Sequence, residues 1–255
     1  MHALSEFTTL RLGGPPRHLV EAGDEDALVR AVRQADVEHS PVLVFGGGSN
    51  IVVADDGFPG TVVRVLSSGV YKHREGDSWI LHVQAGESWD ALVSRSVRAG
   101  LAGFECLSGI PGSVGATPIQ NVGAYGQEVS ETIVSVRVYD REQDVVCELN
   151  PLECEFAYRA SIFKRTPSRW VVLGVTFSLP EQPHSRPIRY TELARALQVR
   201  VGDSAPLGSV REAVLALRRS KGMVLSEDDP DTRSVGSFFV NPTFSSEEFE
   251  RLVER

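Results

Sequence analysis

One nineteen-residue stretch dominates the chain: Gly109-Ile-Pro-Gly-Ser-Val-Gly-Ala-Thr-Pro-Ile-Gln-Asn-Val-Gly-Ala-Tyr-Gly-Gln127. It contains five glycines and two prolines and carries no charge, whereas a solvated linker would be more polar and more repetitive. Glycines at this density let the backbone approach a ligand closely and adopt positive φ angles. Gln120, Asn121 and Tyr125 are set among them and could supply hydrogen bonds. Taken alone, the stretch is equally compatible with a set of ordinary tight turns.

Size and composition are those of a soluble globular protein. The 255 residues suffice for one or two domains with a substantial core, and 42% are hydrophobic and 24% charged. No apolar run approaches the roughly 18 residues that a membrane span needs. The segment Met1–Phe7 lacks the basic and apolar regions of a secretion signal. We therefore expect a cytoplasmic protein with no membrane partner.

The three cysteines, Cys106, Cys147 and Cys154, are too few for a disulfide framework and lack the paired spacing of a zinc site. No metal is expected, because the six histidines are also scattered. The net charge of −8 argues against a nucleic-acid partner, which requires a basic face. A small anionic ligand needs only a few local cations. Two clusters could supply them: Arg159 with Lys164 and Arg165, and Arg218 and Arg219 with Lys221. Each cluster could equally be an ordinary solvated surface.

Hydrophobic periodicity predicts an α+β fold. Helices are expected at 26–36 with Asp24 as N-cap, 89–99 between Ser88 and Gly100, 190–198, 209–220 with Ser209 as N-cap, and 246–255. Strands are expected at 41–45, 51–53, 61–66, 79–83, 132–139, 144–149 and 169–178. Three prolines within 180–189 predict a boundary between a mixed region, 1–180, and a more helical unit, 181–255.

A second glycine-rich segment, Gly46-Gly-Gly-Ser-Asn50, follows the strand expected at 41–45. Consecutive glycines expose successive backbone N–H groups, which is a common way to hold a pyrophosphate, and Ser49 and Asn50 add side-chain donors. The segment is not a Rossmann fingerprint, because Ile51-Val-Val53 predicts a strand where that motif opens a helix. By itself the segment is also compatible with a common turn.

Six motifs follow one another along the chain: Phe7-Thr-Thr with Gly13-Gly14, Gly46–Asn50, the Gly109–Ala116 and Pro118–Gly126 halves of the long stretch, Tyr158-Arg-Ala-Ser-Ile-Phe-Lys164, and Gly236-Ser-Phe-Phe-Val-Asn-Pro242. Together they cover nearly the whole chain. The chain thereby resembles the UDP-N-acetylenolpyruvoylglucosamine reductase (UDP-N-acetylmuramate dehydrogenase) family, the FAD enzymes of bacterial peptidoglycan precursor synthesis.

The resemblance implies an FAD-binding domain of the vanillyl-alcohol-oxidase type over 1–180, with α+β subdomains at about 1–68 and 69–180, and a substrate-binding domain over 181–255. FAD would be bound without a covalent link. NADPH would reduce it and leave, and UDP-N-acetylglucosamine-enolpyruvate would then take the same place, so no separate nucleotide-binding domain is needed. We expect a monomer.

The resemblance also implies roles for particular residues. The cofactor-binding set comprises Gly46, Gly47, Gly48, Ser49, Asn50, Ile110, Pro111, Gly112, Ser113, Gly115 and Gly123. Arg159 matches the arginine that stabilises negative charge on the substrate after hydride delivery to C3, and a guanidinium suits a carboxylate. Ser237 matches the serine that protonates C2. The alternatives are a structural salt bridge for Arg159 and a loop hydroxyl bonded to backbone for Ser237.

The implied substrate-binding set comprises Gln120, Tyr125, Tyr158, Tyr190, Lys221 and Asn241. Tyr190 resembles the tyrosine that closes over the substrate, but it could be a core aromatic at a helix start. Lys221 resembles a lysine near the substrate, but helix C-termini favour cations in any case. Asn241 could equally form an Asn-Pro turn.

The chain departs from the family pattern after Pro242, where only thirteen residues follow. The family continues there and supplies a catalytic glutamate, whereas Glu247, Glu248, Glu250 and Glu254 here look like solvated helix charges. Val240 replaces a family lysine. We therefore expect FAD binding with poor turnover. The alternatives are an FAD-binding or sugar-nucleotide-binding remnant, or another flavin oxidase of this fold; Arg159 and Ser237 favour the reductase.

Overall fold

The computed structural model describes residues 2–234, 236 and 241–253. Its N-terminal part is a three-stranded parallel sheet of order β1-β3-β2, formed by β1 (Pro16–Ala22), β2 (Val42–Phe45) and β3 (Phe58–Val65). Helix α1 (Glu25–Val37) joins β1 to β2 and packs on this sheet through Leu28 and Val32. Its N-terminus is capped as expected, because the Asp24 carboxylate accepts the Ala27 N–H at 2.7 Å.

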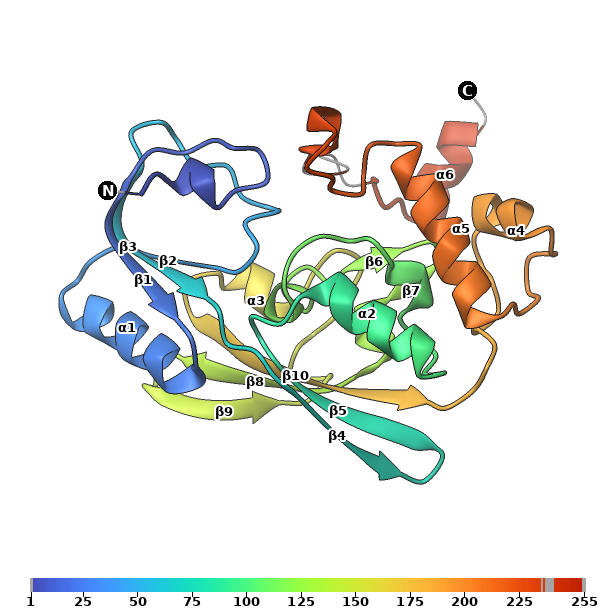
Figure 1. The fold of residues 1–255 in the computed structure, drawn as a ribbon, viewed down its shortest axis with the longest axis horizontal. Helices are drawn as coiled ribbons and strands as arrows, with labels where there is room; N and C mark the ends of the chain where they lie inside the picture. The colour runs from blue at the N-terminus through green and yellow to red at the C-terminus, as the bar shows by residue number, and fades with distance from the viewer. Residues whose placement is uncertain (1, 235, 237–240, 254–255) are drawn as a thin grey trace.

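The central part is a five-stranded antiparallel sheet of order β4-β5-β10-β8-β9 (Figure 1). Its strands are β4 (Val70–Glu75), β5 (Ser78–Gln84), β8 (Ile133–Asp140), β9 (Val145–Leu149) and β10 (Trp170–Pro180). Helix α2 (Trp89–Arg98) packs on it, with the buried rings of Trp89, Phe104 and Phe177 in contact. β10 is the middle strand of this sheet, and its residues Val171 to Val175 are all buried, as expected for a strand covered on both faces.

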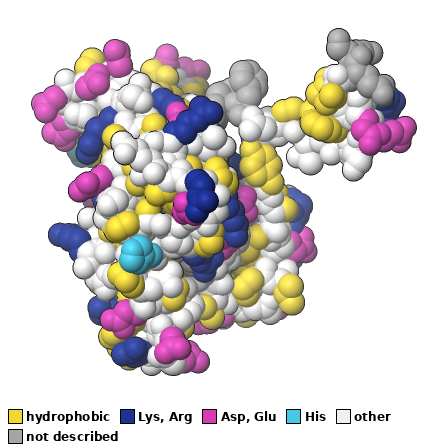
Figure 2. All heavy atoms as spheres, turned by 90° about the vertical axis from the view of Figure 1, so that its right-hand side faces the viewer, with side chains coloured by type: hydrophobic (Ala, Val, Ile, Leu, Met, Phe, Trp, Pro, Cys, Tyr) yellow, Lys and Arg dark blue, Asp and Glu magenta, His cyan; other side chains and the backbone are white. Residues whose placement is uncertain are grey.

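A helical unit follows β10. Helices α4 (Thr191–Leu197) and α5 (Leu207–Arg219) share a second, smaller core built from Ile188, Leu193 and Val210. The remaining elements are a short hairpin of β6 (Gly123–Ala124) and β7 (Gln127–Glu128), a single helical turn α3 (Ile162–Arg165), and α6 (Ser246–Val253). On the face at the right of Figure 1, Lys and Arg side chains are mixed with hydrophobic ones (Figure 2).

Most elements expected from periodicity are present, and three expectations were wrong. The Ser88 side chain makes no capping hydrogen bond at the start of α2. Residues 51–53 form an irregular segment and no strand. From this segment, Ile51 and Val53 pack against a small core that contains Leu4 and Phe45. The helix expected from Ser209 begins at Leu207, because Leu207 is buried and the Pro206 carbonyl already accepts the Val210 N–H.

Strands β1 and β4 were not predicted. β1 begins with a proline, and β4 is mostly exposed, so neither shows the alternation that signals a strand. The last strand of the three-stranded sheet ends at Val65, and the first strand of the five-stranded sheet begins at Val70. The domain boundaries themselves remain predictions. Among the described residues, no helix combines the length and apolarity that crossing a bilayer would require.

Candidate active site

The two glycine-rich segments recognised separately in the sequence lie against each other. β2 runs directly into Gly46–Asn50, and a Cβ atom on Gly47 would lie 3.0 Å from the Cα atom of Gly112. A Cβ atom on Gly46 would lie 2.1 Å from Oγ of Ser113. Only glycine therefore permits this approach of the two backbones.

The Gly46–Asn50 loop has the properties of an anion-binding nest. Gly48 has φ +61°, its carbonyl accepts the Thr9 N–H at 3.0 Å, and a Cβ atom there would lie 2.2 Å from the Phe7 carbonyl oxygen. Across the described part of the chain, the N–H groups of Gly47 to Asn50 donate to no protein acceptor. Clustered free N–H groups of this kind suit a phosphate or pyrophosphate.

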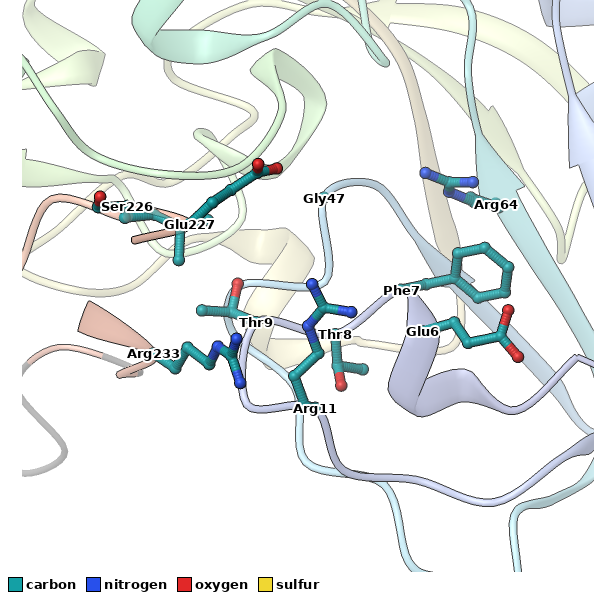
Figure 3. Close-up of a pocket in the computed structure, with 11 residues that line it drawn as sticks. Glu6, Phe7, Thr8, Thr9, Arg11, Gly47, Arg64, Ser226, Glu227 and Arg233 are labelled. Carbon is teal, nitrogen blue, oxygen red and sulfur yellow. The ribbon is translucent and has the colours of Figure 1, made fainter. Parts of the chain in front are cut away.

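An open pocket of about 460 Å³ borders Gly47 (Figure 3). The N-terminal segment and β3 contribute Arg11 and Arg64, and Arg233 comes from a segment far along the chain. The Arg64 guanidinium lies 4.6 Å from the ring centroid of Phe7 and 2.8 Å from a carboxylate oxygen of Glu21. Each of these arginines is isolated in the sequence, so no local cluster of basic residues marks it as part of a site.

The β6–β7 hairpin presents Tyr125 at its tip. Tyr125 has φ +49°, and its ring meets the Tyr190 ring edge to face, with centroids 5.4 Å apart. Burial raises the pKa of the Tyr125 hydroxyl, and the nearby positive charges of Lys221 and Arg218 partly oppose this shift. The hydroxyl is therefore a neutral hydrogen-bond donor at physiological pH.

Lys221 lies just beyond the end of α5 and faces the same tyrosines. Its Nζ is 2.8 and 2.9 Å from the two carboxylate oxygens of Glu192 on α4, and this hydrogen bonding raises the pKa of Lys221. An open pocket of about 410 Å³ adjoins this group, lined by Arg189, Tyr190 and Arg195 among others. Three predicted substrate residues, Tyr125, Tyr190 and Lys221, are thus brought together from distant parts of the sequence.

Arg159 occupies a tight turn next to the hairpin. The turn is closed by mutual backbone hydrogen bonds between Ala157 and Ala160, and Arg159 has φ +53°. Its Nη2 donates to the Gly123 carbonyl at 2.8 Å. Within the described residues Arg159 pairs with no carboxylate, which removes support for the salt-bridge alternative. Tyr158 beside it is 49% exposed.

Arg218 is a partly buried cation that the sequence showed only as one member of a basic cluster. Its Nη2 donates to the Met223 carbonyl at 2.9 Å, while its Nε is buried and lacks a protein acceptor among the described residues. Burial lowers the pKa of Arg218, and Tyr125 and Asp90 oppose the shift. It lies beside Gly109, where a Cβ atom would be 3.4 Å from Arg218 Nε. A positive charge thus adjoins the start of the long glycine-rich stretch.

The structure does not place every predicted residue in this group. Ser237 lies outside the described residues. Asn241 is exposed, and it makes no hydrogen bond to the group around Tyr125 in the described ranges. Gln120 is partly buried and likewise has no described partner. The described residues contain no cluster of three or more His, Cys, Asp or Glu side chains that could hold a metal ion.

Comparison with known proteins adds three findings. Residues 16–147 match the model of the FAD binding domain family. The UDP-N-acetylenolpyruvoylglucosamine reductase of Thermobifida fusca is 55% identical over 254 residues, which is 99% of this chain and 71% of that protein; the reductase of Salinispora arenicola is 56% identical over 99% and 69%. The crystal structure of the Thermus caldophilus reductase aligns with a TM-score of 0.65 at 26% identity, over 99% of this chain and 79% of that one.

Proposed function

The chain belongs to the UDP-N-acetylenolpyruvoylglucosamine reductase family, and from this premise we propose that it is an FAD-dependent oxidoreductase that reduces UDP-N-acetylglucosamine-enolpyruvate to UDP-N-acetylmuramate with NADPH. This reaction belongs to peptidoglycan precursor synthesis. The observation that carries the proposal is Arg159: its guanidinium is anchored by the Gly123 carbonyl and by no carboxylate among the described residues, so it can receive a substrate carboxylate. We further propose a cytoplasmic monomer.

The two glycine-rich segments fit FAD. The free N–H groups of Gly47 to Asn50 would hold its pyrophosphate, because a Cβ atom on Gly46, Gly47 or Gly48 would collide with neighbouring atoms and the backbone itself must form the contact surface. The 110–115 segment would line the same cofactor, with Gly115 packed on Ala85. When bound, FAD supplies a two-electron carrier between NADPH and C3 of the substrate. Arg218 would place a permanent positive charge beside it.

Arg159 and Ser237 would act on the substrate itself. Hydride addition at C3 leaves negative charge on C2 and its carboxylate, and Arg159 would donate hydrogen bonds to that charge. Ser237 would then transfer its Oγ proton to C2; this role rests on the family motif Gly236-Ser-Phe-Phe239.

The group around Tyr125 would bind the anionic remainder of the substrate. Lys221 remains charged because Glu192 raises its pKa, and Tyr125 and Tyr190 each offer a hydroxyl and an aromatic face. NADPH and the sugar nucleotide both carry a diphosphate, so one cationic site can serve both in turn. Gln120, Gly123, Tyr158 and Asn241 remain predicted contacts.

Anaerobic stopped-flow absorption of the purified, FAD-loaded protein tests the proposal. NADPH should bleach the flavin band, and the enolpyruvyl UDP-sugar should restore it slowly, in line with the poor turnover expected from the sequence. Arg159→Ala should leave bleaching intact and slow recovery by about 10²–10³-fold, whereas the control Arg165→Ala, an exposed arginine paired with Glu155, should change neither. Bleaching without recovery in the unaltered chain would contradict the reductase and favour the alternative of a binding protein without turnover.

A further inference from the structure

The Asn121 side chain connects the β6–β7 hairpin to the turn that carries Arg159. It is 1% exposed and its hydrogen-bonding capacity is used within the protein. Its Nδ2 donates to Glu128 Oε2 at 2.7 Å and to the Ala157 carbonyl at 3.1 Å, and its Oδ1 accepts the Ser130 N–H at 3.2 Å. A buried amide with both ends satisfied is costly to disturb, so its orientation is well defined.

These contacts hold Arg159 from both ends. On one side, Asn121 binds the carbonyl of Ala157, which lies two residues before Arg159 in the turn. On the other side, it binds Glu128 in β7 and the backbone N–H of Ser130, which follows β7. The opposite strand of the same hairpin offers the Gly123 carbonyl, which accepts Arg159 Nη2 at 2.8 Å. The turn and the guanidinium are therefore held against one rigid element.

The left-handed backbone makes this anchoring necessary. Arg159 has φ +53°, a conformation that costs a non-glycine residue roughly 1–2 kcal/mol and persists only where the surroundings impose it. Asn121 itself has φ +44°, which asparagine tolerates better than most residues. Asparagine combines this tolerance with two N–H donors and one acceptor on a short side chain.

We propose that Asn121 is a positioning residue that orients Arg159 for charge stabilisation in the second half-reaction. The inference rests on the proposed function only for the chemistry; the orientation of Arg159 is testable without turnover. Asn121 acts through Arg159 and contacts no reacting atom.

Three variants separate positioning from simple folding. Asn121→Asp keeps the acceptor for Ser130 N–H but removes both donors and faces Glu128 with a like charge. Asn121→Gly keeps the left-handed backbone and removes every side-chain bond. Ser130→Ala is the matched control, because Ser130 contributes only its backbone N–H to Asn121 and that group remains.

The first measurement is NMR of isotope-labelled arginine in the FAD-loaded chain, with the Arg159 signal assigned by its loss in Arg159→Lys. Hydrogen bonding to Gly123 should slow rotation of the guanidinium in the unaltered protein and in Ser130→Ala. Rotation should become fast in Asn121→Gly and Asn121→Asp. Slow rotation in both Asn121 variants would overturn the proposal, as would loss of FAD from both, since Asn121 would then support the cofactor scaffold.

The second measurement is the pair of half-reactions. Flavin reduction by NADPH should be unchanged in the Asn121 variants, while reoxidation by the UDP-sugar should slow by about 10²-fold, an effect typical of a misplaced catalytic group. In an Arg159→Ala background, Asn121→Gly should have no further effect. Additive losses would overturn the proposal. If the unaltered chain is not reoxidised, the proposed function fails, and the arginine rotation alone decides the role of Asn121.

Discussion

At the scale of single residues, three residues of the candidate site have left-handed backbone. Asn121, Tyr125 and Arg159 all have φ between +44° and +53°, and each carries a side chain proposed to bind, act or position. Strained conformations of this kind are retained where the surroundings over-determine them, and they gather at functional sites. The sequence identified Tyr125 and Arg159 by motif; the role of Asn121 became visible only through its contacts.

Gly48 has left-handed backbone within the loop that we propose binds FAD. Gly48→Ala should weaken FAD binding by at least about tenfold, because φ +61° is unfavourable for alanine and the new Cβ would lie 2.2 Å from the Phe7 carbonyl. Titration of the apoprotein with FAD, followed by flavin fluorescence, measures the change. The matched control is Gly23→Ala, where a Cβ meets nothing within 4 Å. Equal affinities in the two variants would contradict the assignment of this loop to FAD.

At the scale of elements, the central strand of the large sheet is secured to β8 by an ion pair as well as by its backbone ladder. Arg169, just before β10, forms two hydrogen bonds of 3.1 and 2.7 Å with Asp140 at the end of β8. The Asp140 side chain is only 3% exposed. Hydrogen bonding from Arg169 lowers the pKa of Asp140 below its ordinary value of 3.8, and burial opposes this shift.

Asp140→Asn should therefore destabilise the protein by about 1.5–3 kcal/mol at pH 7. Because the folded-state pKa is depressed, the stabilisation is present above the ordinary pKa of 3.8 and is lost as the pH falls through the folded value. The difference in unfolding free energy between wild type and variant should shrink between pH 7 and pH 3. Urea unfolding across this range measures it. The control is Glu148→Gln, an exposed position on β9, which should change the unfolding free energy by less than about 1 kcal/mol. If the destabilisation caused by Asp140→Asn were the same at all pH values, the depressed pKa of Asp140 would not be its cause.

At the scale of the whole molecule, a two-point ion pair is among the contacts that join the helical unit to the FAD-binding region. Arg211 on α5 binds both carboxylate oxygens of Asp90 on α2, at 2.7 and 2.8 Å, and is 15% exposed. Asp90 also accepts the Gly109 N–H at 2.6 Å. The same carboxylate therefore connects the helical unit, the large sheet through α2, and the start of the long glycine-rich stretch.

Arg211→Ala should loosen this junction and lower stability by about 1–3 kcal/mol, because it leaves a partly buried carboxylate with one partner fewer. Hydrogen exchange should accelerate in α4 and α5 while the amides of β8 and β10 stay protected. Arg219→Ala, an exposed arginine at the end of the same helix, serves as the control. Uniform acceleration over the whole chain would show that the junction is not a separate unit of stability.

The elements that could be predicted from the sequence are those whose signals lie within a few neighbouring residues. The helix observed at 25–37 was predicted at 26–36 from its apolar spacing and Asp24, and α2 was predicted at 89–99 from its apolar spacing and Gly100, because capping and periodicity act within a few residues. The strand predicted at 51–53 was wrong, because apolar residues can also pack from an irregular segment when a small core lies beside them. β4 was missed because an exposed edge strand needs no alternating pattern.

By itself, the sequence determined the family, the FAD-binding class and the identity of the glycine-rich segments, because these depend on residue types in a linear order. Only the tertiary structure decided that Gly47 faces Gly112, that Tyr125, Tyr190 and Lys221 form one group, and that Asn121 connects the hairpin to the Arg159 turn. The physical reason is one of range. Backbone preferences act over a few residues, whereas these contacts follow from sheet order and core packing, which bring together segments that share no local signal.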